Sequence, residues 1–201
     1  MIFHKYRLVY IGIAKNASAS IFHRLQNATD QRFEHFDIFD ILSSNDIELL
    51  KSYYILSTVR NPYDRFYSAY LWIHVNNLDQ EVTEKEIERG INEYVNRIYA
   101  SSEKWYYDIP HLRPQHDYIS FRDKIMVDRI FRFEHLQDDW KKFVTEYNTY
   151  SEFKLKEELH KQNESPKRLK DWRQMYSPET KKKLHELYRT DFELFGYDSE
   201  L

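Results

Sequence analysis

Tyr10-Ile-Gly-Ile-Ala-Lys-Asn-Ala-Ser-Ala-Ser-Ile21 is the stretch that decides the fold of this chain. The apolar residues 8–13 predict a short buried strand, and the small and hydroxyl-bearing residues after them lead into a predicted helix. Small side chains let backbone N–H groups approach a ligand, and a helix N-terminus adds positive potential. Lys15 supplies a full charge. The loop is not a Walker A motif, because its glycines are absent and the lysine precedes the small residues. It predicts a phosphate-type site, but not a nucleoside triphosphatase.

A second anion site is predicted further along the chain. Tyr53-Tyr-Ile-Leu-Ser-Thr-Val59 is β-branched, aromatic and apolar, which indicates a buried strand. This strand ends at Arg60, and Asn61-Pro62 provides an N-cap and a first helical residue for a helix towards residue 75. Ligands of open α/β sheets bind outside the carboxyl ends of the strands. We therefore expect Arg60 and Ser68 to converge on one phosphate.

The remaining sequence completes an α/β pattern. Charged, amphipathic segments predict helices over 83–99, 136–147 and 178–189, the last with Ser177 as its N-cap, and 124–133 predicts one or two short strands. Strands that alternate with helices indicate a three-layer, P-loop-like α/β fold with a central, mainly parallel sheet flanked by helices.

Composition favours one compact enzyme domain over residues 1–201, with neither linker nor repeat. The net charge of −3 argues against a general nucleic-acid-binding protein. There is no cysteine, and the spacing of His111 and His116, with Asp117, suits neither a helix face nor a strand face, so we expect no metal. Apolar runs are too short to span a bilayer and no signal peptide fits, which predicts a cytoplasmic protein.

Two segments carry a family resemblance. Lys15-Asn-Ala-Ser-Ala-Ser20 and Val59-Arg-Asn-Pro-Tyr-Asp-Arg-Phe-Tyr-Ser-Ala-Tyr70 resemble the two signature elements of sulfotransferases that use 3′-phosphoadenosine 5′-phosphosulfate (PAPS). The lysine loop is closest to the K-T-A-S-T-S form of the glycosaminoglycan uronyl 2-O-sulfotransferases, in the carbohydrate branch. The resemblance covers about residues 8–198. Three further matches follow in the family's order: His111-Leu-Arg-Pro-Gln115 with Tyr118-Ile119, Arg132-Phe-Glu134 with Leu136, and Tyr188 with Asp191-Phe-Glu-Leu-Phe-Gly-Tyr197.

The resemblance implies a donor site in two halves. Arg60 and Ser68 hold the 3′-phosphate, and the product is adenosine 3′,5′-bisphosphate (PAP). Two residues depart from the family: Ala14 replaces a proline, which leaves the loop entry less rigid, and Ala19 replaces a threonine, which removes a hydroxyl bond worth roughly 0.5–1.5 kcal/mol. The 5′-phosphosulfate is expected on six loop residues: Lys15, Asn16, Ala17, Ser18, Ala19 and Ser20.

Sulfuryl transfer needs a general base, because the acceptor hydroxyl loses its proton as it attacks in line. Carbohydrate sulfotransferases commonly place a catalytic histidine between the two signatures, where this chain has Phe33-Glu-His-Phe-Asp37. His35 is the first candidate, since imidazole titrates near neutral pH, and Glu34 is the second. The alternative for His35 is a structural residue bonded to the backbone.

The acceptor implied by the resemblance is a carbohydrate or glycan, with protein tyrosine as a further possibility. Loops over 76–83 and 100–115 are expected to bind it, and Trp105, Tyr106 and Tyr107 either stack on sugar rings or pack in the core. His111 contacts acceptor or cofactor, or instead caps the irregular stretch between two prolines. The candidate substrate-binding residues are His111, Arg113 and Gln115.

Basic residues over 165–173 predict either a lid, with Lys167 or Arg168 near the 3′-phosphate, or an exposed basic helix start. Two other functions compete with the sulfotransferase. One is a P-loop-like small-molecule kinase, against which the missing Walker A glycines and magnesium carboxylate count. The other is a non-catalytic nucleotide- or glycan-binding module. Golgi relatives carry a membrane anchor that this sequence lacks, so we expect a microbial or viral protein.

Overall fold

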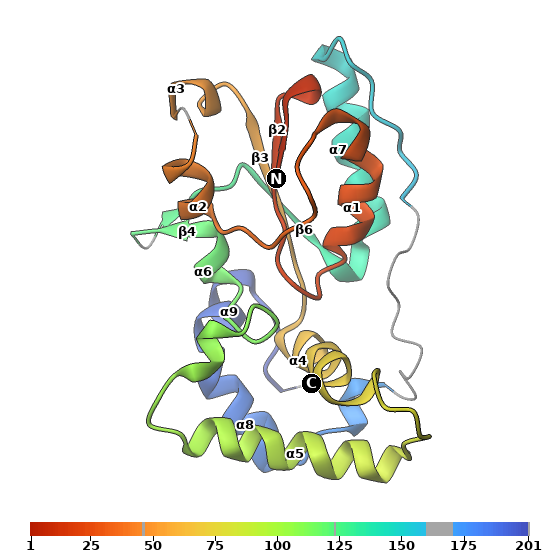
Figure 1. Ribbon diagram of the computed structural model, residues 1–201, viewed down its shortest axis with the longest axis vertical. Helices are drawn as coiled ribbons and strands as arrows, with labels where there is room; N and C mark the ends of the chain where they lie inside the picture. Colours follow the sequence, from red (N-terminus) through yellow and green to blue (C-terminus); the bar gives the residue numbers. More distant parts are fainter. Residues whose placement is uncertain (46, 123, 160–170, 201) are drawn as a thin grey trace. The chain divides into compact units, whose positions relative to one another are not determined.

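The computed structural model describes residues 1–45, 47–122, 124–159 and 171–200 (Figure 1). The chain forms two compact units, each made of two segments. The first unit contains Met1–Arg60 and Gln115–Asn163, and the second contains Asn61–Pro114 and Glu164–Leu201. A single sulfotransferase-like domain over 1–201 stays a prediction.

A four-stranded sheet forms the centre of the first unit. Its order is β1 (Ile2–Phe3), β2 (Leu8–Ile11), β3 (Tyr54–Val59) and β6 (Arg129–Arg132). The last three strands are parallel, and β1 pairs antiparallel with β2. Every residue of β2 is buried, as expected for a strand covered on both faces. The register places Ile11 beside Ser57 and Val59 beside Arg132, so the carboxyl ends of three strands lie along one edge.

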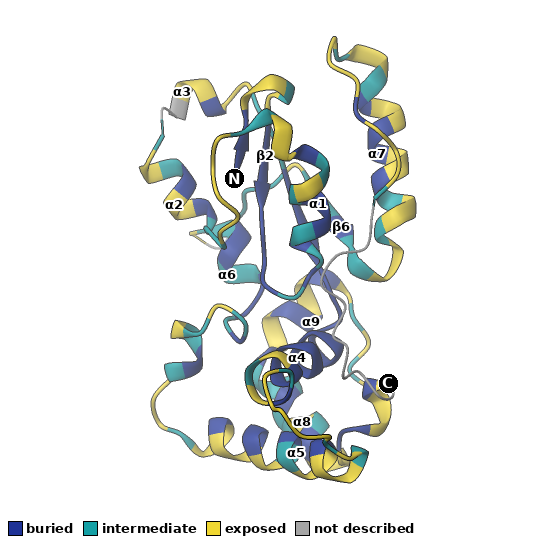
Figure 2. Cartoon of the chain, turned by 45° about the vertical axis from the view of Figure 1, so that its right-hand side comes forward, coloured by how far each residue is buried: buried dark blue, intermediate teal, exposed yellow. Residues whose placement is uncertain are grey.

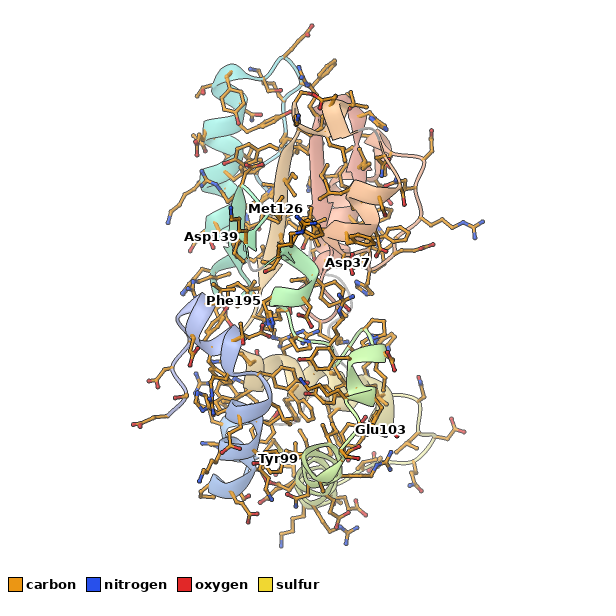
Figure 3. All side chains as sticks on the ribbon, turned by 90° about the vertical axis from the view of Figure 1, so that its left-hand side faces the viewer. Asp37, Tyr99, Glu103, Met126, Asp139 and Phe195 are labelled. Carbon is orange, nitrogen blue, oxygen red and sulfur yellow. The ribbon has the colours of Figure 1, made fainter. Side chains whose placement is uncertain are left out.

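Helices cover both faces of this sheet. Figure 1 shows α1 (Ser18–Leu25) and α7 (Leu136–Tyr150) on one side, and α2 (Ile38–Ser43) and α6 (His116–Ile119) on the other. The expected three-layer α/β fold with a mainly parallel sheet is therefore confirmed. Asp139 at the start of α7 (Figure 3) accepts a hydrogen bond from the Arg132 N–H at 2.9 Å, which ties the helix to the end of β6. The unit also contains α3 (Ile47–Leu50) and a hairpin of β4 (Ser120–Phe121) with β5 (Lys124–Ile125).

The second unit is helical. The expected caps are present: the Asn61 side chain accepts from the N–H groups of Tyr63 and Asp64, and Ser177 accepts from Thr180. Figure 2 shows α5 buried along one face and exposed along the other, as its amphipathic pattern predicts. None of the helices in the described ranges is long and apolar enough to cross a membrane. The main helices are α4 (Pro62–Tyr70), a π-helix (Leu71–Val75), α5 (Glu84–Ala100), α8 (Pro178–Leu187) and α9 (Arg189–Phe195).

Two boundaries in this unit differ from the sequence expectation. The helix expected to run from Pro62 towards residue 75 changes to π geometry at Leu71. The helix expected over 178–189 ends at Leu187, because the backbone of Tyr188 leaves helical geometry (φ −116°, ψ 27°) before α9 begins. The buried Tyr188 hydroxyl donates to the Leu112 carbonyl at 2.7 Å, which anchors this junction in the core.

Candidate active site

The candidate site lies at the carboxyl edge of the parallel strands in the first unit. The loop over residues 12–17 follows β2, Arg60 follows β3, and Phe133 follows β6. Because the strands are parallel and in register, these three segments emerge side by side. This edge is the place where open α/β sheets bind ligands.

The lysine loop has a strained backbone. Lys15 (φ 69°) and Ala17 (φ 57°) both adopt left-handed conformations, at a cost of roughly 1–2 kcal/mol each for a residue with a Cβ. Such turns point successive N–H groups into a common concavity that suits an anion. The Ser18 hydroxyl donates to the Ile13 carbonyl at 2.7 Å, closing the loop on itself. Its hydroxyl proton is therefore used within the loop, in contrast to the phosphate contact expected from the sequence.

Two cationic side chains meet at this loop. Arg60 is only 4% exposed, and its Nη1 donates to the Lys15 carbonyl at 2.8 Å. Its guanidinium carbon lies 3.8 Å from the centroid of the Phe133 ring, within range of a cation–π interaction. Burial, and secondarily the charge of Arg60, lowers the pKa of Lys15 from 10.5 to about 8. The charge of Arg60 therefore acts on the Lys15 ammonium, and a multiply charged anion would offset this repulsion.

The sequence did not lead us to expect that Phe133 contacts the Arg60 guanidinium. The signal was present, because this residue directly follows the third parallel strand, at the same edge as Lys15 and Arg60. What the sequence could not show is that its ring lies against the guanidinium.

Two buried amides connect the loop to β3. Asn16 and Gln115 are both 0% exposed. The Asn16 Nδ2 donates to the Thr58 carbonyl at 2.8 Å and to Gln115 Oε1 at 2.7 Å. Gln115 Oε1 also accepts from the Arg60 N–H at 2.9 Å, while its Nε2 donates to the Arg60 carbonyl at 2.9 Å. Gln115 is thus enclosed by the chain, which corrects the expectation that it contacts the acceptor. Within the described ranges, Asn16 Oδ1 is buried without a hydrogen-bond partner.

His35 lies half-buried beside the lysine loop, in a segment without regular secondary structure. Its Nδ1 is 2.6 Å from the Gly12 carbonyl oxygen. Because a carbonyl only accepts, Nδ1 carries the hydrogen, so in the neutral ring Nε2 is the nitrogen that can accept a proton. The ring of Phe33 packs edge-on against the imidazole, with centroids 5.2 Å apart. Glu34 is exposed.

The comparison with protein families agrees with this geometry. A family model described as the sulfotransferase family matches residues 1–198. The chain belongs to the sulfotransferase family. It is therefore a transferase of the sulfuryl-transfer class, which acts with a small-molecule donor and an acceptor, and its α/β architecture is consistent with the P-loop-like fold. No curated protein matches the chain, and no solved structure does.

The other expected site residues of this sulfotransferase lie in the second unit. Ser68 is buried in α4, and Arg113 is half-buried in the loop before Pro114. His111 is nearly parallel to the Trp72 ring, with an interplanar angle of 12° and centroids 6.0 Å apart. Trp72 belongs to the π-helix and is 45% exposed. Lys167 and Arg168 lie outside the described residues, so the expected lid stays a prediction.

The three aromatic residues expected either to stack on sugars or to pack in the core differ in their burial. Tyr106 is 4% exposed and belongs to the hydrophobic core of the second unit, so it packs. Trp105 and Tyr107 are partly buried against the same core.

No metal centre is evident in the part of the chain that the structure describes, where no group of three or more histidine, aspartate or glutamate side chains converges. His116 and Asp117, which lie close in sequence, instead approach each other, with Nε2 3.2 Å from Oδ1.

Proposed function

We propose that this sulfotransferase moves a sulfuryl group from PAPS to a hydroxyl of a carbohydrate or glycan. The observation that carries the proposal is that Arg60 and Lys15 lie together at the carboxyl edge of the parallel sheet, where the Arg60 guanidinium donates a 2.8 Å hydrogen bond to the backbone carbonyl of Lys15. PAPS carries phosphate at two positions, so its charge matches this pair. The N-terminus of α1, which directly follows the left-handed turns of the loop, would add backbone N–H donors for an anion.

The proposed reaction is an in-line displacement at sulfur. The acceptor oxygen forms a new bond to sulfur, while the bond between sulfur and the 5′-phosphate oxygen breaks and PAP leaves. Negative charge grows on that phosphate, and Lys15 stabilises it at the loop. Arg60 is assigned to the 3′-phosphate.

His35 is the proposed general base. The hydrogen bond from Nδ1 to the Gly12 carbonyl fixes the tautomer in which Nε2 accepts the proton of the acceptor hydroxyl. Phe33 limits rotation of the ring by packing against it. Glu34 remains the second candidate, and its side chain is exposed.

A carbohydrate acceptor is favoured by an aromatic surface in the second unit. Trp72 presents an exposed indole, and His111 lies nearly parallel to it. Flat aromatic faces pack against the C–H faces of sugar rings. The π-helix that carries Trp72 is also a rare geometry that occurs frequently at functional sites.

Calorimetric titration with PAP, beside AMP and ATP, tests the donor site. We expect micromolar affinity for PAP and much weaker binding of the other two nucleotides. A preference for ATP would instead support the small-molecule kinase.

Transfer is tested with radiolabelled PAPS and panels of glycans and tyrosine-containing peptides. Label on a glycan supports the proposal, and label on the peptides moves the acceptor to protein tyrosine. Binding of PAP without transfer to any acceptor would support the non-catalytic binding module.

A further inference from the structure

The Gln115 amide forms an unusual pair of hydrogen bonds with a single residue. It accepts from the N–H of Arg60 and donates to the carbonyl of Arg60, both at 2.9 Å. This pattern is the one that a neighbouring strand makes with a residue of a sheet. Gln115 thus acts as a one-residue strand that extends the sheet beyond Val59 and fixes the peptide groups on either side of the arginine.

The same amide reaches the lysine loop. Gln115 Oε1 accepts a second bond, from Asn16 Nδ2 at 2.7 Å, and Asn16 is the neighbour of Lys15. The Arg60 guanidinium donates a hydrogen bond to the Lys15 carbonyl at 2.8 Å. These bonds close a ring that runs from Gln115 through Arg60, Lys15 and Asn16 back to Gln115.

The closed ring has a mechanical consequence for the loop. Lys15 and Ala17 are held in left-handed conformations that residues with a Cβ disfavour, so the loop relaxes unless other interactions hold it. Gln115 and Asn16 are fully buried, where a hydrogen bond is not exchanged for one with water. This ring of hydrogen bonds therefore holds the loop in left-handed conformations that glycine residues would adopt without such a restraint.

We propose that Gln115 is a positioning residue that holds Arg60 and the lysine loop in one arrangement, so that the two halves of the donor site bind as a unit. The inference rests on the proposed function, since it assigns the 3′-phosphate to Arg60 and the 5′-phosphosulfate to the loop. Gln115 itself touches neither donor nor acceptor.

Gln115→Met tests the proposal, because methionine has similar length and volume but makes none of these three bonds. Gln137→Met is the matched control. Gln137 lies on α7 in the same unit and also makes two backbone hydrogen bonds, to the Glu157 carbonyl at 2.9 Å and from the Leu159 N–H at 3.1 Å. Each variant is titrated with PAP and with AMP, which lacks the 3′-phosphate, and is melted without ligand.

For Gln115→Met we expect PAP affinity to fall at least about tenfold and AMP affinity to fall less, so that the preference for PAP shrinks. Gln137→Met should keep both affinities. A merely structural role would lower the melting temperature without changing the PAP-to-AMP ratio of the folded protein, and that result would overturn the inference.

Asn16→Ala provides a second variant should Gln115→Met fail to fold. It cuts the ring on the loop side and leaves the Gln115–Arg60 pair in place, so PAP and AMP affinities should fall together by severalfold. Unchanged affinities would overturn the inference. If the wild-type protein itself shows no preference for PAP, the proposed function fails as well. If the wild type prefers PAP, the positioning role alone is refuted when Gln115→Met keeps that preference or when Asn16→Ala keeps both affinities.

Discussion

If Lys15 binds the donor as proposed, its lowered pKa should make PAP binding depend on pH in a range that is easy to measure. In the free protein, burial and then Arg60 lower this pKa to about 8, from 10.5. A bound phosphate beside the ammonium favours its charged form and raises the pKa again. Binding is therefore strongest below pH 8, where Lys15 is already protonated, and weakens above it, where a proton must be taken up from solution.

The size of the effect follows from the two pKa values. If the bound phosphate restores the pKa to 10.5, the affinity for PAP falls roughly tenfold between pH 7 and pH 9, a loss of about 1.4 kcal/mol. Near pH 8, binding takes up about half a proton, because half of the free protein is deprotonated at Lys15. The phosphates of PAP, with a second pKa of about 6, are largely ionised above pH 7 and contribute little.

Calorimetry from pH 7 to pH 9 measures this directly, with buffers of different ionisation enthalpy reporting the proton uptake. Lys15→Arg is the control, because a guanidinium stays charged throughout and its variant should bind with little pH dependence. Affinity that is flat over this range in the wild type would refute the reasoning. A slope of equal size in Lys15→Arg would also refute it, since the titrating group would then lie elsewhere.

Three other substitutions probe the site and the core. His35→Gln should reduce turnover by about 10²–10⁴-fold with PAP affinity nearly unchanged, because it removes the proton acceptor; transfer assays that show a fully active variant would move the base to Glu34. Arg60→Ala should weaken PAP binding far more than AMP binding in calorimetry, and equal losses for the two would exclude its role at the 3′-phosphate. In the second unit, a Cβ at position 90 would overlap the hydroxyl of the buried Tyr70. Gly90→Ala should therefore lower the melting temperature despite its gain of about 1 kcal/mol in helix propensity. The loss should disappear in a Tyr70→Phe background, and a loss that persists there would contradict the proposed overlap with the hydroxyl.

Local patterns predicted most of the fold. The apolar run of β2, the β-branched run of β3 and the amphipathic face of α5 each contain their own signal, because burial and helix geometry act over neighbouring residues. The N-cap at Asn61 was predictable for the same reason. The change to π geometry at Leu71 was not, since no single residue there imposes it.

In the candidate site, too, local sequence patterns predicted some features and left others hidden. Lys15 and Arg60 were identifiable because each follows a predicted strand, and parallel strands end at a common edge. The left-handed turns at Lys15 and Ala17 were hidden, since glycine, the residue that normally marks such turns, is absent from both positions. Gln115 was expected to contact the acceptor because the sequence shows that its side chain is polar, but not that it is fully buried.

The sequence by itself determined which elements form, the edge of the sheet that carries the candidate anion site, and the residue types proposed to serve it. These properties depend on the local order of side chains along the chain. Only the tertiary structure decided that Gln115 pairs with Arg60, 55 positions away, that Asn16 joins them, and that Gly12 fixes the tautomer of His35. Hydrogen bonds between distant residues depend on the packing that brings them together. For that reason no local pattern contains them.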